Sequence, residues 1–125
     1  MTYTELVTEL QTQATAQGFD FTLDYTQVIN ERASKDYPAM LLLPISSVTD
    51  LQDSHFNKTY TIEGFVTEVA GTETAVFQTL ENKLKAFLNA LSEAVLTVKI
   101  ERIPQMANDK LMALKFSFDY IVTEC

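Results

Sequence analysis

Cysteine, histidine and tryptophan are scarce in this sequence of 125 residues. There is one cysteine (Cys125), one histidine (His55) and no tryptophan. A single cysteine rules out an internal disulfide, and the set of Cys and His ligands that holds a structural zinc ion is lacking. We therefore expect no metal and no cofactor, and the composition suits a reducing compartment.

Glycine is also rare, and the three glycines, Gly18, Gly64 and Gly71, stand far apart. Phosphate-cradling loops and nucleophile elbows need clustered glycines, so neither motif is present. No linker, internal repeat or low-complexity tract interrupts the sequence. We expect one domain over residues 1–125, a length at which a single core suffices.

Long apolar runs and positive charge are lacking as well. The longest apolar run, Ala39–Leu43, ends at Pro44 and is far shorter than the ~18 residues that cross a bilayer. The first residues lack the basic and apolar segments of a secretory signal. Nine basic residues against 17 acidic ones give a net charge of -8, which opposes binding to a phosphate backbone. We expect neither a membrane nor specific nucleic-acid binding.

Two segments have the three- and four-residue spacing of amphipathic helices. Residues 4–17 form the first, with a capping box at Thr2 and Glu5, and with Gly18 placed as a left-handed C-cap. Residues 72–91 form the second. Its apolar stripe consists of Val76, Phe77, Leu80, Leu84, Phe87, Leu88 and Leu91.

The first half of the chain also predicts three strands. Apolar and polar residues alternate over residues 19–25, and residues 39–43 are apolar on both faces. A long polar loop is expected over residues 46–57. The strand that follows changes its apolar parity at Gly64, which is typical of a β-bulge.

Two more strands follow the second helix. Leu96, Val98 and Ile100 are expected to face inward on one of them. The other carries an inward row at Met112, Leu114, Phe116, Phe118, Tyr120 and Val122. The connection over residues 104–110 is longer than a tight turn needs, so we expect it to project.

These elements predict an α+β fold with the order α-β-β-β-α-β-β. The sheet is single and mostly antiparallel, has about five strands, and packs both helices against one face. The two strongest elements supply the centre of the core. We expect that centre to consist of Phe77, Leu84, Phe87, Phe116 and Phe118.

Four residues have side chains capable of chemistry. His55 lies in a polar loop and has no partner secured by the sequence, so we interpret it as a solvated residue. Cys125 is the last residue, next to Glu124, which is a poor setting for a reactive thiolate. Asp20 and Asp24 share a strand face, a spacing that suits a hard cation or acid–base work if a second group converges there. No acidic cluster accompanies them, so we interpret them as part of a solvated strand face. We expect no enzyme activity.

Some apolar residues point outward. Leu111, Ala113 and Ile121 lie on the face opposite the inward row of the last strand, which indicates cover by a neighbouring subunit or by the first helix.

Subunit contacts are also expected at the projecting segments, 46–57 and 104–110. Phe56, Ile103 and Met106 flank or occupy these segments and are candidate interface residues, although Phe56 and Ile103 equally suit the ends of the core.

The element order, the length and the segment Asp36-Tyr37-Pro38-Ala39-Met40-Leu41-Leu42-Leu43-Pro44 resemble small tail-terminator and tail-completion proteins of long-tailed bacteriophages. The resemblance spans nearly the whole chain. It implies a homo-oligomeric ring, a hexamer, that caps the tail tube, stops its polymerisation and presents a surface to the neck. Tail tube and neck proteins are then the partners, and the virion, assembled in the host cytoplasm, is the location. An acidic lumen would let DNA pass without sticking. The family has few diagnostic side chains, so the resemblance assigns no site residues.

Two other classes of function remain open from the sequence. One is a cytoplasmic α+β binding or regulatory module without catalysis, which holds a small ligand or a peptide on its sheet. The other is an enzyme whose site forms between subunits. The mass in solution separates a ring from a module, because a ring has a multiple of the chain mass of 14.1 kDa.

Overall fold

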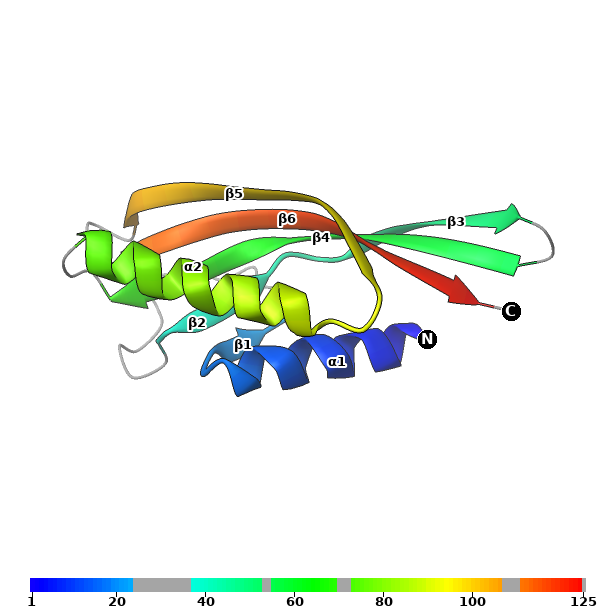
Figure 1. Ribbon diagram of the computed structural model, residues 1–125, viewed down its shortest axis with the longest axis horizontal. Coiled ribbons are helices and arrows are strands. Elements are labelled where there is room, and N and C mark those ends of the chain that lie inside the picture. Colours follow the sequence, from blue (N-terminus) through cyan, green and yellow to red (C-terminus); the bar gives the residue numbers. More distant parts are fainter. Residues whose placement is uncertain (24–36, 53–54, 70–72, 107–110, 125) are drawn as a thin grey trace.

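The computed structural model describes residues 1–23, 37–52, 55–69, 73–106 and 111–124, with the backbone alone at residues 52, 73, 74, 104–106, 123 and 124. Within these residues, two helices pack on one mixed sheet of six strands (Figure 1). The α+β class is confirmed. The order is α-β-β-β-β-α-β-β, with one strand more than the sequence predicts.

The strand order in the sheet is β1-β2-β4-β6-β5, and β3 pairs with β4 beside β2. Among the strands that the structure describes, only β1 and β2 run parallel to each other, so the sheet is mostly antiparallel as expected. The bounds are β1 Asp20–Thr22, β2 Ala39–Leu42, β3 Ser46–Gln52, β4 His55–Val69, β5 Ala94–Met106 and β6 Leu111–Glu124. The helices are α1 Tyr3–Ala16 and α2 Glu73–Ala90.

The ends of α1 are set by local chemistry, as predicted. Thr2 and Glu5 exchange two hydrogen bonds of 3.2 Å, each from a backbone N–H to the other residue's side-chain oxygen. The bonds from Thr2 hold the pKa of the Glu5 carboxyl below its usual value. At the other end Gly18 has a φ of 83°, and its N–H donates to the carbonyl of Thr15 at 2.9 Å, as in a Schellman motif.

Both helices lie on the same side of the sheet, which we call the helix face; the opposite side is the outer face (Figure 1). One core cluster joins both helices to the sheet. The predicted core centre is confirmed, because Phe77, Leu84, Phe87, Phe116 and Phe118 are each at most 1% exposed. The predicted inward row of the last strand is also buried along its whole length.

The two short strands fit their predictions in the part that is described. β1 falls within the expected 19–25 segment, whose residues from 24 onward lie outside the described residues. All four residues of β2 are fully buried, which confirms a strand covered on both faces.

The β-bulge predicted at Gly64 is wrong. β4 pairs with β6 in one continuous register over Phe56–Val69. Tyr60, Ile62 and Val66 are all buried on the helix face, so the parity of the strand does not change. Of the odd positions after Gly64, Phe65 is half-buried and Thr67 is buried on the outer face, whereas Val69 is 41% exposed.

The segment that joins β2 to β3 contains one residue more than the stretch of β4 beside it. Leu42 pairs with Gly64 and Ser46 pairs with Thr61, so four steps along one side match three along the other. Gly64 serves a close approach of the two strands. A Cβ at this position would lie 2.4 Å from the carbonyl oxygen of Leu41.

The long polar loop predicted over residues 46–57 is also wrong, because these residues form most of a β-hairpin. Its strands are β3 and the first half of β4, and β6 pairs alongside. We call residues 46–52, 55–61 and 119–124 the arm. The arm extends past the ends of both helices (Figure 1), so the expectation that this region projects is confirmed.

β5 departs from its predicted pattern because of a bulge. Its register with β6 shifts between Leu96 and Lys99, and Thr97 within the shift has a φ of 55°. The shift reverses the parity of the strand, so Leu96 lies on the outer face and is 49% exposed. Val98 is on the helix face but 43% exposed, and only Ile100 packs against the core as expected.

The projecting connection predicted over residues 104–110 is shorter than expected. β5 continues to Met106, which pairs with Leu111 at the start of β6. Residues 107–110 lie outside the described residues.

Candidate assembly interface

The residues considered for catalysis do not come together in the described structure. His55 is exposed at the start of β4, where it pairs with Gln52. Asp20 is exposed at the start of β1. Asp24 and Cys125 lie outside the described residues. The part of the chain that is described holds no group of three His, Cys, Asp or Glu side chains arranged to bind a metal ion.

Neither described helix has the length and hydrophobicity needed to cross a bilayer.

The helix face of the arm presents apolar side chains that nothing in the described chain covers. Leu51 and Phe56 pair across the two strands near the tip and are 65% and 48% exposed. Nearer the body, the ring of Tyr3 stacks on that of Tyr60 with centroids 6.2 Å apart. Tyr60 itself is buried, so the exposed apolar groups of this face are Tyr3 at the start of α1 and Phe56 and Leu51 near the arm tip.

The outer face of the arm is partly apolar as well. Val48 is 64% exposed and opposite Thr59, which in turn pairs with the half-buried Ile121. Leu96 lies one row away, opposite Asp119. Exposed apolar groups on both faces of a projecting hairpin are typical of an element that a partner covers.

Of the predicted interface residues, Phe56 belongs to the arm and is exposed. Ile103 is half-buried on the outer face, opposite Ala113. Met106 ends β5, and only its backbone is described. The sequence therefore identified one arm residue and missed Val48 and Leu51. The sequence does contain a sign of strand β3, because Val48 is β-branched and Leu51 is a large aliphatic residue. Both stand among serine, threonine and aspartate residues, which favour a loop.

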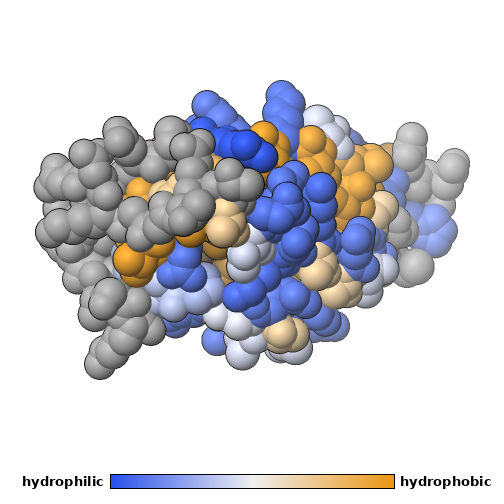
Figure 2. Space-filling view, turned by 60° about the vertical axis from the view of Figure 1, so that its left-hand side comes forward, coloured by the Kyte–Doolittle hydropathy of each residue, from blue (hydrophilic) through white to orange (hydrophobic). Residues whose placement is uncertain are grey.

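A hollow lies beside β5 on the helix face. Its lining consists of Lys85, Leu88 and Asn89 of α2 with Val95 and Val98 of β5, and its volume is about 340 Å³. The bulge in β5 forms this hollow, because the shifted register leaves Val98 facing α2 without packing under it. Figure 2, turned so that the left-hand side of Figure 1 comes forward, shows apolar areas on a mainly hydrophilic exterior.

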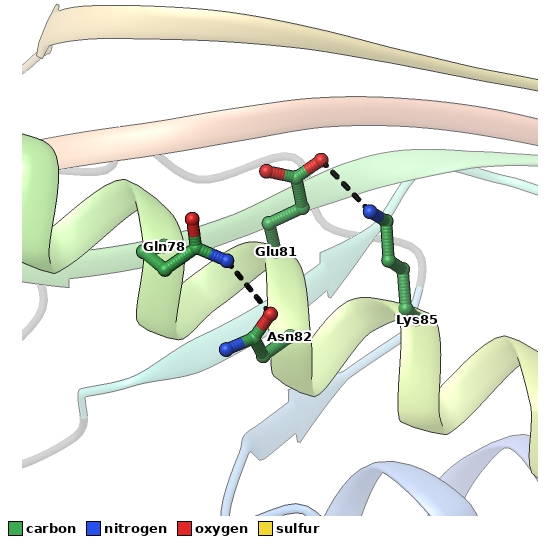
Figure 3. A network of polar contacts seen from close by, with 4 residues as sticks. All are labelled: Gln78, Glu81, Asn82 and Lys85. Carbon is green, nitrogen blue, oxygen red and sulfur yellow. Dashed lines mark hydrogen bonds and ion pairs between the residues drawn. The ribbon is translucent and has the colours of Figure 1, made fainter.

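The exposed side of α2 next to this hollow is polar and weakly held. Lys85 forms an ion pair of 3.2 Å with Glu81, and Gln78 donates to Asn82 at 2.8 Å (Figure 3). Exposed pairs at this helical spacing contribute only ~0.3–0.5 kcal/mol. Lys85 can therefore exchange its partner at little cost.

A hydrogen-bonded cluster joins α1, the start of β5 and the base of the arm. Glu9 accepts from the N–H of Ser92 at 2.6 Å and from the hydroxyl of Tyr120 at 3.0 Å. The same hydroxyl accepts from the N–H of Glu93 at 2.9 Å. Burial, opposed by hydrogen bonds from Ser92 and Glu93, raises the pKa of Tyr120. The cluster fixes β6 against the helices where the arm begins.

The outer face changes character along the sheet. At the β2 end, Leu111 and Ala113 are buried although α1 packs on the opposite face, so α1 is not their cover. Thr67 is fully buried in the same region, and its hydroxyl has no hydrogen-bond partner in the described part of the chain.

Towards β5 the outer face becomes charged. A shallow hollow there is lined by Glu63, Glu101, Lys99, Lys115, Ser117, Ile100 and Phe116. Mixed charges on an open strand face are typical of a solvated surface.

Comparison with protein-family models and with curated proteins gave no match for this chain.

Proposed function

We propose that this chain is a structural protein that works by self-assembly, as the tail-terminator or tail-completion ring of a tailed bacteriophage. In this role it forms a homo-oligomeric ring, a hexamer, at the junction of tail tube and neck. It has no catalytic activity, and it is a component of the virion assembled in the host cytoplasm.

The arm is the observation that carries this proposal. Its large apolar residues, Val48, Leu51 and Phe56, are 48% to 65% exposed. Burying one such side chain contributes ~1.5–3 kcal/mol, so leaving all of them in water in the final state would be costly. A chain that builds a projection and places apolar groups near its tip is suited to contacts with other subunits.

The charge of the chain is compatible with a ring around DNA. The net charge of -8 makes the surface repel a phosphate backbone, which favours passage of DNA over binding.

The first experiment measures mass by light scattering after size exclusion. The wild type should have a multiple of 14.1 kDa and appear as rings by electron microscopy. A Leu51→Asp, Phe56→Asp variant should keep its circular dichroism spectrum and become monomeric. Val69→Asp is the matched control, because Val69 is 41% exposed at the opposite end of β4.

The second experiment tests the specific role. Adding the ring to polymerising tail-tube protein should limit the length of the tubes. A wild type that is monomeric at all concentrations, or tubes of unchanged length, would refute the corresponding part of the proposal.

A further inference from the structure

We propose that the arm tip of one copy of this chain occupies the hollow between β5 and α2 of the next copy, which makes the contact between subunits head-to-tail. This inference rests on the proposed ring and specifies its interface. The occupant is a second copy, because the projection and the hollow belong to the same chain and match each other face by face.

On the helix face, both surfaces present apolar side chains. The arm tip presents Leu51 and Phe56, and the hollow presents Leu88, Val95 and Val98. Its volume of about 340 Å³ lies in the range of pockets that enclose several apolar groups. Among the described residues, no acidic side chain lines the hollow.

On the outer face, the arm has one acidic side chain next to Leu51, and β5 has one basic side chain next to Val98. Asp50 precedes Leu51 on β3 and faces outward opposite Asn57. Lys99 follows Val98 on β5 and faces outward opposite Ser117. Neither Asp50 nor Lys99 has an ion-pair partner in the part of the chain that the structure describes.

The arm and β5 therefore have the same two-sided pattern in consecutive residues. When the arm tip lies along β5 with the helix faces aligned, Leu51 meets Val98 while Asp50 meets Lys99. The charge complementarity matters in a chain with a net charge of -8, since most other surfaces of two copies repel each other.

The two edges of the sheet explain why the contact uses side chains. β3 and β5 lie at opposite edges. β5 is interrupted by the bulge at Thr97, and a bulged edge resists the addition of another strand. The same bulge opens the hollow. A projection at one edge and a hollow at the other make a contact that repeats from copy to copy, which closes into a ring when the rotation allows.

The test uses one variant on each side of the contact. Leu51→Asp damages the arm and leaves the hollow intact, whereas Val98→Asp damages the hollow and leaves the arm intact. Each variant alone should be monomeric by light scattering, with an unchanged circular dichroism spectrum. Val69→Asp is the matched control, because Val69 is 41% exposed, similar to the 43% of Val98, and lies at the end of β4 away from the arm and outside the lining of the hollow; it should assemble like the wild type.

An equimolar mixture of the two variants should give dimers and nothing larger. The arm of the Val98→Asp chain binds the hollow of the Leu51→Asp chain, and the two remaining surfaces are both damaged. The observed mass should be twice 14.1 kDa. A mixture that stays monomeric, or a Val98→Asp chain that still forms the wild-type oligomer, would overturn the inference while leaving the ring itself intact.

Charge reversal gives a second, independent readout. Asp50→Lys and Lys99→Asp should each weaken assembly about two- to fivefold, the range for exposed ion pairs. The chain with both changes should recover wild-type assembly, because every contact then pairs a lysine on the arm with an aspartate on β5. A double variant weaker than either single one would count against the alignment of the two faces. A wild type that never oligomerises would instead refute the ring.

Discussion

Thr67 is a buried residue whose hydroxyl finds no hydrogen-bond partner in the described structure. A polar group that loses water without gaining a partner costs ~1–3 kcal/mol. We expect Thr67→Val to raise the free energy of unfolding by about 1 kcal/mol, because valine keeps the shape and the β-branching. Urea unfolding measures the change.

Thr61 provides the control for this substitution. It lies on the same strand, and its hydroxyl donates to Asp119 at 3.3 Å. Thr61→Val should therefore give no gain. An equal gain at both positions would attribute the effect to strand propensity and not to the orphaned hydroxyl of Thr67.

Tyr120 is the second residue with a measurable signature. Tyr120→Phe removes the hydroxyl that bonds Glu9 and Glu93, which should lower the free energy of unfolding by about 1 kcal/mol near neutral pH. The pKa of Tyr120 is raised in the folded state, so folding favours the neutral phenol. That contribution is complete below the usual pKa of about 10 and is lost as the pH rises through the raised pKa.

The stability difference between wild type and Tyr120→Phe should therefore narrow from about pH 10 upward. Chemical unfolding of both proteins at a series of pH values checks this. The other titratable groups are the same in both proteins, so their effects cancel when one unfolding free energy is subtracted from the other. A gap that stays constant to about pH 11 would show that Tyr120 does not titrate as its burial implies.

At the scale of elements, α2 holds the sheet through a continuous stripe. Leu84 is fully buried in its centre. We expect Leu84→Ala to lower the free energy of unfolding by about 2–5 kcal/mol, through lost transfer energy and a residual cavity. Leu96→Ala, at an exposed position of β5, should change it by less than ~0.5 kcal/mol. Losses of similar size at both sites would disprove the assigned core.

The elements that sequence could predict are those specified locally. The capping box of Thr2 and Glu5, and the positive φ of Gly18, mark the ends of α1 within a few residues. The stripe of α2 and the inward row of β6 follow from burial on one face alone. These features need no knowledge of which strands become neighbours.

The elements that sequence missed depend on pairing across the sheet. The sequence of β3 predicts a loop because neither face of this strand is buried in the core. A strand exposed on both faces needs no alternation of apolar and polar residues. The bulge in β5 is set by the register against β6, and it reversed the assignment of Leu96. The sequence predicts a bulge at Gly64 because Phe65 and Val69 occupy odd positions after it, although Val66 keeps the even positions on the helix face. The hollow beside Val98 follows from that same register and had no signal in the sequence.

At the scale of the whole molecule, a purely structural role makes a clear prediction about the reactive side chains. Replacing His55 and Cys125 together by Ala should leave oligomer mass and tube-length control unchanged. His55 is exposed and lies on the outer face of the arm, away from Leu51 and Phe56. Loss of tube control in a variant that folds and forms rings normally would indicate a chemical role instead.

The position of β6 in the sheet has a consequence for the timing of folding. β6 lies inside the sheet, between β4 and β5, although it is the last strand along the sequence. Its partners on β4 are 42 residues away at one end (Val69 with Leu111) and 68 away at the other (Phe56 with Glu124). Pairing over such distances along the chain is slow compared with local contacts.

During synthesis on the ribosome, the helices and the β3–β4 hairpin emerge before β6. The core cannot close until β6 has been made, because β6 pairs with β4 and packs under α2. The third strand of the arm is the final part of β6, so the arm is complete only after β6 has been made, and a chain synthesised only as far as β5 has no finished arm with which to enter an assembly.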